Sequence, residues 1–513
     1  MDSERPVSLT RLGPGDYPRE PVAVEGLSVR FLKASRIVPL SLSGDTLEVA
    51  AADPSDRTAV EALEFAYGFR IEVRAGRPED ILDAIERLYG AGSQSMETII
   101  EEAGRDLYEI TAEGETDVDQ LRDLASEAPI IRLVNRLILN AVEQRASDIH
   151  FEPFENQLKV RYRIDGVLVE VESPPNRLQA AIISRVKIMA KLDIAERRLP
   201  QDGRIKLKIA DREIDFRIST IPTLYGESLV MRILDRETLI LDLQKLGFPE
   251  GIYGRYLDLI RQPYGMILVT GPTGSGKTST LYTTLARINA PENKIITLED
   301  PVEYQLRGVN QIQVSPKIGL SFASGLRAIV RQDPDIILVG EIRDRETAEI
   351  AIQSALTGHL LFSTLHTNDA AGAITRLLDM GVAHYLLAST LLGVLAQRLV
   401  RVICPDCREP VDPDRKLLRS MGLTPEAVAD VQFYDGAGCD GCRGTGYRGR
   451  MAIFEYLPVN DPIRSEIVAR SSTERVRAAA VDEGMVTLRK DGWQKVMAGI
   501  TTLSEVLRVT LDN

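Results

Sequence analysis

The chain has 513 residues, of which 44% are apolar and 27% charged, as expected for a globular protein with about three domains. Its 62 basic and 75 acidic residues give a formal net charge of −13. This acidic balance argues against sequence-independent nucleic-acid binding, which needs a dense basic surface.

The composition also indicates a compartment. No secretory signal is expected at the amino terminus, and no run of about 18 apolar residues predicts a transmembrane helix. Membrane contact is therefore expected to be peripheral or through a partner. The four cysteines all lie between residues 404 and 442, unlike those of a disulfide-stapled secreted protein. The cytoplasm is the expected location.

The first segment, residues 1–90, predicts a small α/β module. Strands are expected at 46–51 and 70–74, and helices at 58–67 and 78–89. The following segment, 91–125, begins with small polar residues and is then rich in Glu and Asp. Such a composition predicts a flexible acidic linker.

The next segment, residues 126–238, is expected to be an α+β domain. Apolar residues at helical spacing predict a helix over 130–144, and Asp165-Gly166 is typical of a hairpin turn. The strands of this domain are expected at 158–164, 167–171, 204–207 and 213–219.

The last segment, residues 239–513, alternates short apolar strands with helical stretches. The strands are expected at 266–270, 294–298, 336–339 and 360–365. This alternation predicts an α/β fold with a mainly parallel sheet covered by helices on both faces.

A phosphate-binding loop follows the first of these strands. Residues 271–278 fit the pattern G-x-x-x-x-G-K-[ST] in full, between an apolar strand and a helix. Its glycines let several backbone N–H groups point at one phosphate chain, Lys277 reaches the β- and γ-phosphates, and the Thr278 hydroxyl binds Mg²⁺. The expected nucleotide-binding residues are Gly271, Pro272, Thr273, Gly274, Ser275, Gly276, Lys277, Thr278 and Ser279.

Two further strands end in acidic residues. Three carboxylates, those of Glu299, Asp300 and Glu303, follow the second strand, at the edge where such sheets bind ligands. The third strand ends in Gly340 and Glu341, where many ATPases have an Asp in place of the glycine. A carboxylate at this position is expected to hold Mg²⁺ or to orient the attacking water.

Histidines and arginines complete the predicted site. Two of the chain's four histidines, His359 and His366, flank the fourth strand, where a histidine could sense the γ-phosphate or cap the core. Hydrolysis also needs positive charge at the transition state. Arg217 and Arg232, on strands of the second domain, are candidates, although most arginines are surface residues.

The four cysteines form two C-x-x-C turns with 31 residues between them, a gap that must hold a small subdomain. Two such turns make a tetrahedral S₄ site, which favours structural Zn²⁺. A redox couple is the alternative, but a thioredoxin-like setting is absent. The expected ligands are Cys404, Cys407, Cys439 and Cys442. The basic, glycine-rich stretch 443–450 that follows is interpreted as a solvated loop.

Together these motifs resemble the ATPases of bacterial type II secretion (GspE type), within the type II/type IV secretion ATPase superfamily. The resemblance extends over nearly the whole chain. Besides the P-loop and the cysteines, the matching stretches are 145–153, 161–167, 198–204, 297–303 (the Asp box), 338–344 (Walker B), 357–369 (the His box) and 491–496.

The resemblance implies a RecA-like ATPase domain (239–513, with the zinc subdomain at 400–450), a PAS-like domain (126–238) and an N-terminal docking module. It implies a homo-hexamer that hydrolyses ATP to drive pseudopilus assembly. Arg217 and Arg232 would contact ATP, while Glu303 and Glu341 would share water activation and Mg²⁺ binding. The N-terminal module would dock on an inner-membrane partner of the GspL type.

Alternatives stay open. The type IV pilus extension ATPases share the cysteine turns, although the short first module favours secretion. A nucleotide-binding scaffold with little turnover is disfavoured because all expected catalytic residues are present. A nucleic-acid translocase is disfavoured by the acidic balance.

Overall fold

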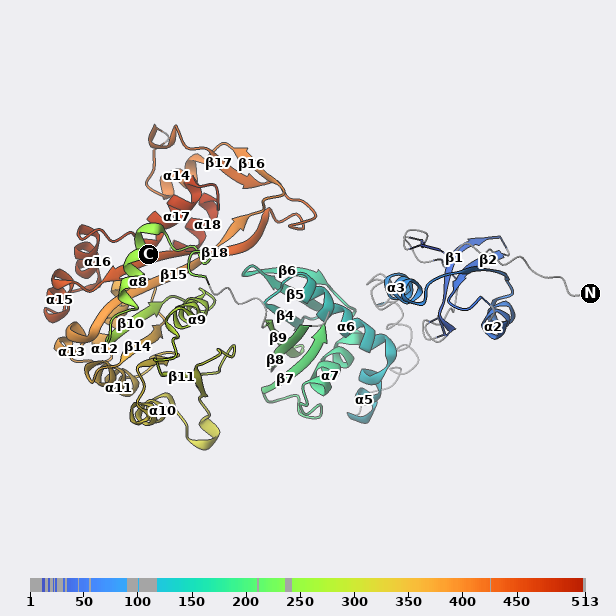
Figure 1. The fold of residues 1–513 in the computed structure, drawn as a ribbon, viewed down its shortest axis with the longest axis horizontal. Helices are drawn as coiled ribbons and strands as arrows, with labels where there is room; N and C mark the ends of the chain where they lie inside the picture. Colours follow the sequence, from blue (N-terminus) through green and yellow to red (C-terminus); the bar gives the residue numbers. More distant parts are fainter. Residues whose placement is uncertain are drawn as a thin grey trace, which may run out of the picture. The chain divides into compact units, whose positions relative to one another are not determined.

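The chain folds into two units, Met1–Leu234 and Asp235–Asn513 (Figure 1). In the computed structural model the described residues are 12–13, 17–18, 22, 24, 31–32, 35–44, 46–54, 57–89, 100, 118–209, 212–235, 242–424 and 426–510.

The first unit begins with a three-stranded module. Its sheet has the order β1-β2-β3, in which β1 pairs antiparallel and β2 and β3 pair parallel. Buried residues of α3 and α2 belong to separate clusters on the two faces of the sheet. The elements are β1 (Ile37–Ser43), β2 (Thr46–Ala51), α2 (Arg57–Tyr67), β3 (Arg70–Ala75) and α3 (Pro78–Tyr89).

The predicted strands and helices of this module are therefore present, but β1 was not predicted. Its second half, with the sequence Leu-Ser-Leu-Ser, is largely exposed, so the sequence lacks a strong apolar signal there. Of the predicted acidic linker, residues 91–99 and 101–117 lie outside the described residues. Its last part belongs to helix α5 (Val118–Ser126).

The rest of the first unit contains a six-stranded sheet with the order β6-β5-β4-β9-β8-β7. Helices α6 and α7 pack against one face of this sheet, on apolar residues such as Phe151, Phe216 and Met231. Asp165 and Gly166 both have positive φ, as a tight hairpin turn requires. The elements are α6 (Ala128–Glu143), β4 (Asp148–Pro153), β5 (Leu158–Ile164), β6 (Val167–Glu172), α7 (Gln179–Met189), β7 (Gln201–Ile209), β8 (Arg212–Thr223) and β9 (Gly226–Asp235).

The second unit is built on a seven-stranded sheet with the order β12-β11-β13-β14-β10-β15-β18. Every pair is parallel except β15 with β18, so the predicted mainly parallel sheet is confirmed. The strands are β10 (Gly265–Thr270), β11 (Ile295–Glu299), β12 (Asn310–Gln313), β13 (Ile336–Val339), β14 (Leu360–Leu365), β15 (Leu391–Ile403) and β18 (Tyr447–Pro458).

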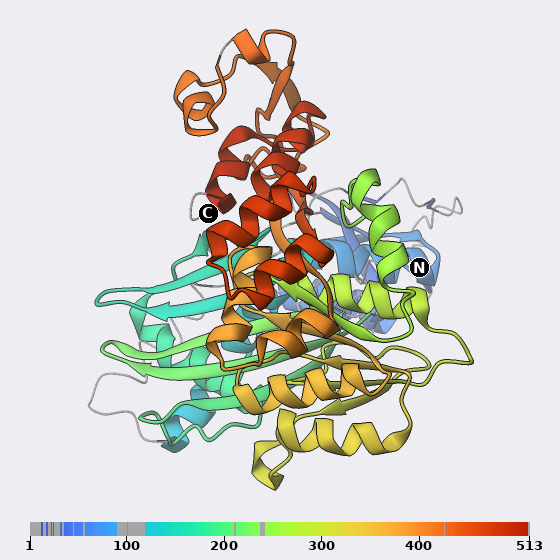
Figure 2. The same ribbon diagram turned by 90° about the vertical axis from the view of Figure 1, so that its left-hand side faces the viewer.

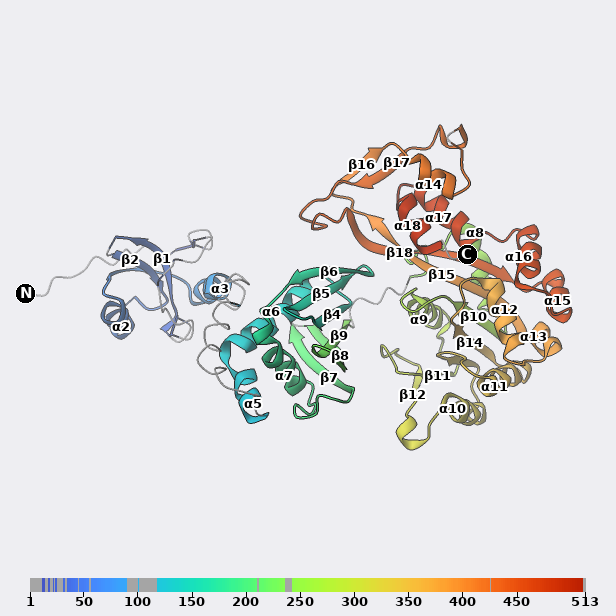
Figure 3. The same ribbon diagram turned by 180° about the vertical axis from the view of Figure 1, so that it is seen from behind.

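Helices cover both faces of this sheet (Figures 1 and 3). In β10, Ile267 and Val269 face α8 and α9, while Met266 and Leu268 face the larger helical layer. The helices are α8 (Glu250–Leu259), α9 (Lys277–Ile288), α10 (Phe322–Ile329), α11 (Arg345–Leu356), α12 (Ala370–Asp379), α13 (His384–Thr390), α15 (Asp461–Val468), α16 (Thr473–Asp482), α17 (Leu488–Met497) and α18 (Leu503–Thr510).

The 31 residues between the cysteine turns form a small substructure with its own strands and helix. Strands β16 (Arg408–Val411) and β17 (Phe433–Gly436) form an antiparallel pair, and α14 (Arg415–Ser420) lies between them in sequence. Figure 2 shows this part (orange) extending beyond the C-terminal helices (red).

Candidate ATPase site

The phosphate loop connects the fully buried strand β10 to helix α9. Gly271 has φ +149, and a Cβ there would lie 2.5 Å from the carbonyl oxygen of Gln397. Gly276 has φ +88, and a Cβ there would lie 2.6 Å from Nε2 of Gln397. Only glycine fits these two positions, because the loop turns tightly against strand β15.

Lys277 stands at the first position of helix α9. Its Nζ donates to the carbonyl oxygens of Gly271 (2.7 Å) and Pro272 (3.0 Å), so the side chain lies along the loop. Burial, with a smaller contribution from Arg398, lowers the pKa of Lys277 to about 8, while Glu341 acts in the opposite direction. Thr278, next in the same turn, is exposed. An ammonium and a hydroxyl at a helix N-terminus form a suitable site for a phosphate chain and its cation.

Glu341 lies beyond the carboxyl end of β13, near Lys277. Gly340 precedes it and extends the ladder to β11, since its N–H donates to the carbonyl of Leu298 at 2.8 Å. A Cβ at Gly340 would lie 3.3 Å from that same oxygen, so a side chain there would fit only tightly. Glu341 itself is half-buried.

The carboxylate of Glu341 has two basic neighbours. It forms an ion pair with Arg343, and it lies 3.3 Å from Nε2 of His366. Burial alone would raise the pKa of Glu341, but Arg343 and His366 outweigh it and the pKa lies below its usual range. His366 follows β14, so the fold brings these two predicted residues together from neighbouring strands.

The acidic end of β11 lies at the same edge of the sheet. Glu299 is buried, Glu303 is half-buried, and Asp300 is exposed. The backbone N–H of Glu303 donates to the hydroxyl of Tyr282 on α9 at 3.3 Å. This contact ties the acidic segment to the helix that begins with Lys277.

His359 lies at the opposite edge. It precedes β14, whose first residue Leu360 pairs with Gly265, the first residue of β10. Six residues at about 3.3 Å each separate this end of the strand from the P-loop edge. The ring Nδ1 of His359 lies 2.8 Å from the carbonyl of Ser354, so this histidine caps the end of α11. The geometry does not bring it to the site predicted for it.

Arg217 and Arg232 belong to the first unit. They lie on β8 and β9, which are neighbours in the six-stranded sheet. Flanking residues such as Phe216 and Met231 are buried under the helices, so both arginines project from the opposite face. Nε of Arg232 donates to Oδ1 of Asp148 at 3.1 Å.

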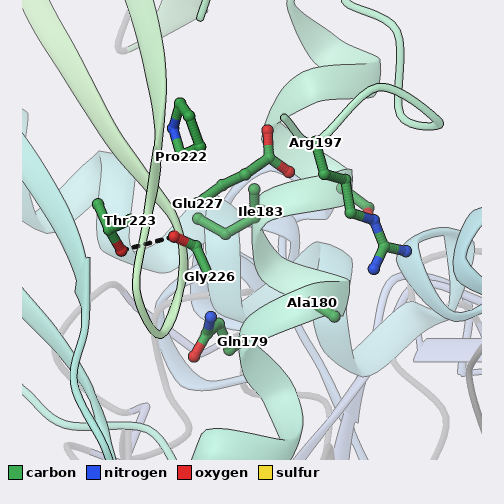
Figure 4. Close-up of a pocket in the computed structure, with 9 residues that line it drawn as sticks. Gln179, Ala180, Ile183, Arg197, Pro222, Thr223, Gly226 and Glu227 are labelled. Atoms are coloured by element: carbon green, nitrogen blue, oxygen red, sulfur yellow. Dashed lines mark hydrogen bonds between the residues drawn. The ribbon is translucent and has the colours of Figure 1, made fainter. Parts of the chain in front are cut away.

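A separate pocket of about 130 Å³ lies between α7 and the β8–β9 hairpin (Figure 4). Gln179, Arg197 and Glu227 contribute to its wall. Glu227 forms a buried ion pair with Lys187 at 2.7 Å, which holds α7 against β9. None of the predicted nucleotide-binding residues lines this pocket.

The four cysteines form a compact cluster. Their sulfur atoms all lie within 4.8 Å of one another, and three pairs are 3.7, 3.8 and 3.9 Å apart. A tetrahedral Zn²⁺ with Zn–S bonds of about 2.3 Å requires sulfur atoms about 3.8 Å apart, so the donor set fits this ion. Backbone N–H groups of Gly438, Cys439 and Gly446 donate to these sulfurs. Such donors stabilise thiolates.

The sequence patterns missed two polar residues of β15 beside the P-loop. Oε1 of Gln397 accepts from the Thr280 hydroxyl of α9 at 2.7 Å. Arg398 donates to the carbonyl and the side chain of Asn368, in the loop that also carries His366. A signal was available, because this Gln-Arg pair interrupts a long apolar run in a strand that pairs directly with β10.

A parallel sheet with a complete P-loop after a central strand and acidic residues at the neighbouring strand ends defines a RecA-like P-loop ATPase. The chain belongs to the type II/IV secretion system protein family, whose model matches residues 123–508. Residues 7–95 match the MshEN domain.

Individual relatives agree with this assignment. The type II secretion system protein E of Xanthomonas campestris pv. campestris is 54% identical over 97% of this chain and 87% of its own length. The type IV pilus assembly ATPase PilB of Myxococcus xanthus is 46% identical over 96% and 87%. The pilus retraction motor PilT, solved with ADP, matches with a TM-score of 0.50 and 28% identity, covering 73% of this chain and 96% of PilT.

In the described part of the chain, no helix combines the length and apolar character needed to cross a bilayer.

Proposed function

We propose that this chain is the motor of a type II secretion system and hydrolyses ATP to drive pseudopilus assembly and protein export. The observation that carries the proposal is the P-loop edge, where Lys277, Glu341 and His366 lie together. The similarity to protein E of Xanthomonas campestris, over nearly all of both chains, supports the choice of secretion system.

The residues of this edge have distinct proposed roles. The loop N–H groups and Lys277 bind the phosphates, and His366 senses the γ-phosphate. Thr278 and Glu341 would hold Mg²⁺, since an exposed hydroxyl in the first helical turn and a carboxylate beyond a neighbouring strand suit this cation. The ion would neutralise charge on the β- and γ-phosphate oxygens.

Water activation belongs to the acidic residues, and charge stabilisation to the arginines of the first unit. Glu303 and Glu341 share the orientation of the attacking water. Arg217 and Arg232 supply positive charge to the transferred phosphoryl group. His359 has no role in this mechanism, because it lies at the other end of β14.

The cysteine cluster is proposed to bind one structural Zn²⁺. Its four sulfur atoms supply all four ligands of a tetrahedral ion, which leaves no open position for substrate.

The assembly is proposed to be a homo-hexamer. The N-terminal module of each subunit, residues 1–90, would dock on a GspL-type protein of the inner membrane. This partner would hold the motor at the cytoplasmic side of the membrane. The division into linker 91–125, PAS-like domain 126–238 and RecA-like domain 239–513 stays a prediction.

Two alternatives remain. The similarity to PilB of Myxococcus xanthus favours a type IV pilus extension ATPase as the first. Expression of the chain in a strain without its own protein E and in a strain without PilB separates the two: export should be restored in the first strain, and pilus extension should not return in the second. A nucleotide-binding scaffold with little turnover is the other alternative.

The first test of the motor is steady-state ATP hydrolysis against protein concentration, beside Lys277→Ala. Specific activity should rise with concentration as subunits assemble and should vanish in the variant. Equal inactivity of both proteins, even with the cytoplasmic domain of the partner present, would favour the scaffold.

A further inference from the structure

The hydroxyl of Tyr282 joins the P-loop helix to the acidic end of β11. Tyr282 lies on α9, and only 1% of it is exposed. Its hydroxyl donates to Oε2 of Glu299 and accepts the backbone N–H of Glu303 at 3.3 Å. One buried oxygen therefore contacts both ends of the segment that presents Glu303.

Glu299 has the properties of an anchor. It is 5% exposed, and its carboxylate also accepts from the Thr297 hydroxyl and from Nε2 of Gln311 at 3.3 Å. A buried carboxylate with three donors is held in place and is poorly placed to bind water or a cation. Of the three acids at this strand end, Glu299 is therefore the one that anchors the Tyr282 hydroxyl.

The protonation of the Tyr282 hydroxyl agrees with its hydrogen bond to Glu299. Burial, together with the charge of Glu299, raises the pKa of Tyr282 well above its usual range. The hydroxyl thus stays protonated and remains a donor to the carboxylate throughout the working pH range.

We propose that Tyr282 is a positioning residue for ATP hydrolysis, which holds the Glu303 segment at a fixed distance from the P-loop helix. The proposal rests on the proposed ATPase function. Tyr282 lies five residues after Lys277, or about 7.5 Å along the helix axis, so its ring moves with the turn that binds the phosphates. An error of about 1 Å in such a geometry can reduce a rate about 100-fold.

The test is Tyr282→Phe, which removes only the hydroxyl. The kcat for Mg·ATP should fall about tenfold or more, while KM and the Kd for a fluorescent ATP analogue change less than about threefold. The matched control is Tyr256→Phe. Tyr256 lies on α8 and is fully buried, and its hydroxyl is hydrogen-bonded to that of Thr284 on α9 at 2.9 Å, not to an acidic residue of β11. This control should lose a similar amount of thermal stability and keep its kcat.

Each outcome decides the proposal. A loss of kcat in Tyr282→Phe alone supports it. Equal losses in both variants, no loss in either, or a rise in KM with unchanged kcat would overturn it, because the hydroxyl would then be merely structural or act on nucleotide binding.

A further variant keeps the test valid if Tyr282→Phe does not fold. Glu299→Gln retains an oxygen that accepts the phenol hydrogen bond and should therefore lose less kcat than Tyr282→Phe. If Tyr282→Phe does not fold, Glu299→Gln should still have an activity at least tenfold above that of Lys277→Ala. A loss equal to that of Lys277→Ala would identify the Glu299 charge as catalytic and overturn the proposal. A wild-type chain without ATPase activity, even with the cytoplasmic domain of the partner present, would instead overturn the proposed function.

Discussion

The second unit contains two candidate sites of opposite construction, the P-loop edge and the cysteine cluster. The P-loop edge collects Lys277, Glu341 and His366 from after three different strands. The cysteine cluster collects its ligands from two turns of four residues each. Strand β15 connects them, since Gln397 lies beside the loop and Cys404 follows the end of the strand.

This difference in construction indicates which site controls the reaction rate and which controls the stability of the fold. At the P-loop edge the polar groups are only partly buried, as for Glu341, or exposed, as for Thr278. In the cysteine cluster all four sulfur atoms lie within 4.8 Å of one another, so a tetrahedral ion bound there would have no open position. Changes at the first site should therefore alter rate with little loss of stability, and changes at the second should do the reverse.

The largest effect is expected for Glu341→Gln. Its kcat should fall by about 100-fold or more, because a group that orients water or holds the cation contributes at least that much. Its Tm should stay within about 2 °C, as the substitution keeps the size of a side chain that is partly exposed (15%). ATPase assays and thermal denaturation measure both. Glu349→Gln, which loses an exposed ion pair with Arg345, is the control and should keep its rate. A variant that lost stability as well as rate would remove the contrast between the two sites.

The second effect concerns the cluster. The purified chain should contain about one zinc ion, measured by elemental analysis. Cys407→Ser should lose this zinc and lower the Tm by about 5–10 °C. Its kcat with excess Mg²⁺, measured well below the Tm, should stay within about threefold of wild type. Asp440→Ala, an exposed change in the other cysteine turn, should affect neither property. Wild-type stability without bound zinc would contradict the structural role.

The same contrast explains how much the sequence could predict. The P-loop and the two C-x-x-C turns are local patterns, so both were recognised directly. Glu341 was found because the carboxyl ends of parallel strands share an edge. The expectation for His359 did not take the direction of the strand into account. His359 precedes β14 and therefore lies at the amino ends of the parallel strands, opposite the P-loop edge.

Other functional candidates could not be predicted because their neighbours come from distant parts of the chain. Tyr282 lies inside the buried stretch 280–285 of α9 and resembles an ordinary core aromatic until β11 is placed beside it. Strand β1 was missed because half of it is exposed. The ATP contact predicted for Arg217 and Arg232 stays a prediction, because both lie on strands of the first unit and the P-loop lies in the second.

The smallest effect is expected at Glu505, which contacts strand β15 close to where the strand leads into the cysteine cluster. Glu505 accepts hydrogen bonds from Arg508 and from the side chain and backbone of Arg401. Burial would raise the pKa of Glu505, but these arginines outweigh it and lower the pKa to about 2. Because the folded pKa lies below the ordinary value of 4.5, the stabilisation is complete above about pH 4.5 and is lost as the pH falls toward 2.

Glu505→Gln should therefore lower the Tm by about 4 °C near pH 7, equivalent to about 1–2 kcal/mol for charged hydrogen bonds in a unit of this size. The difference from wild type should shrink as the pH falls below 4, since protonation removes the same charge from the native protein. Glu170→Gln, which breaks an exposed pair with Lys159, should change the Tm by less than about 2 °C. A Tm difference that stayed constant from pH 7 to pH 3 would show that Glu505 acts through packing and not through its charge.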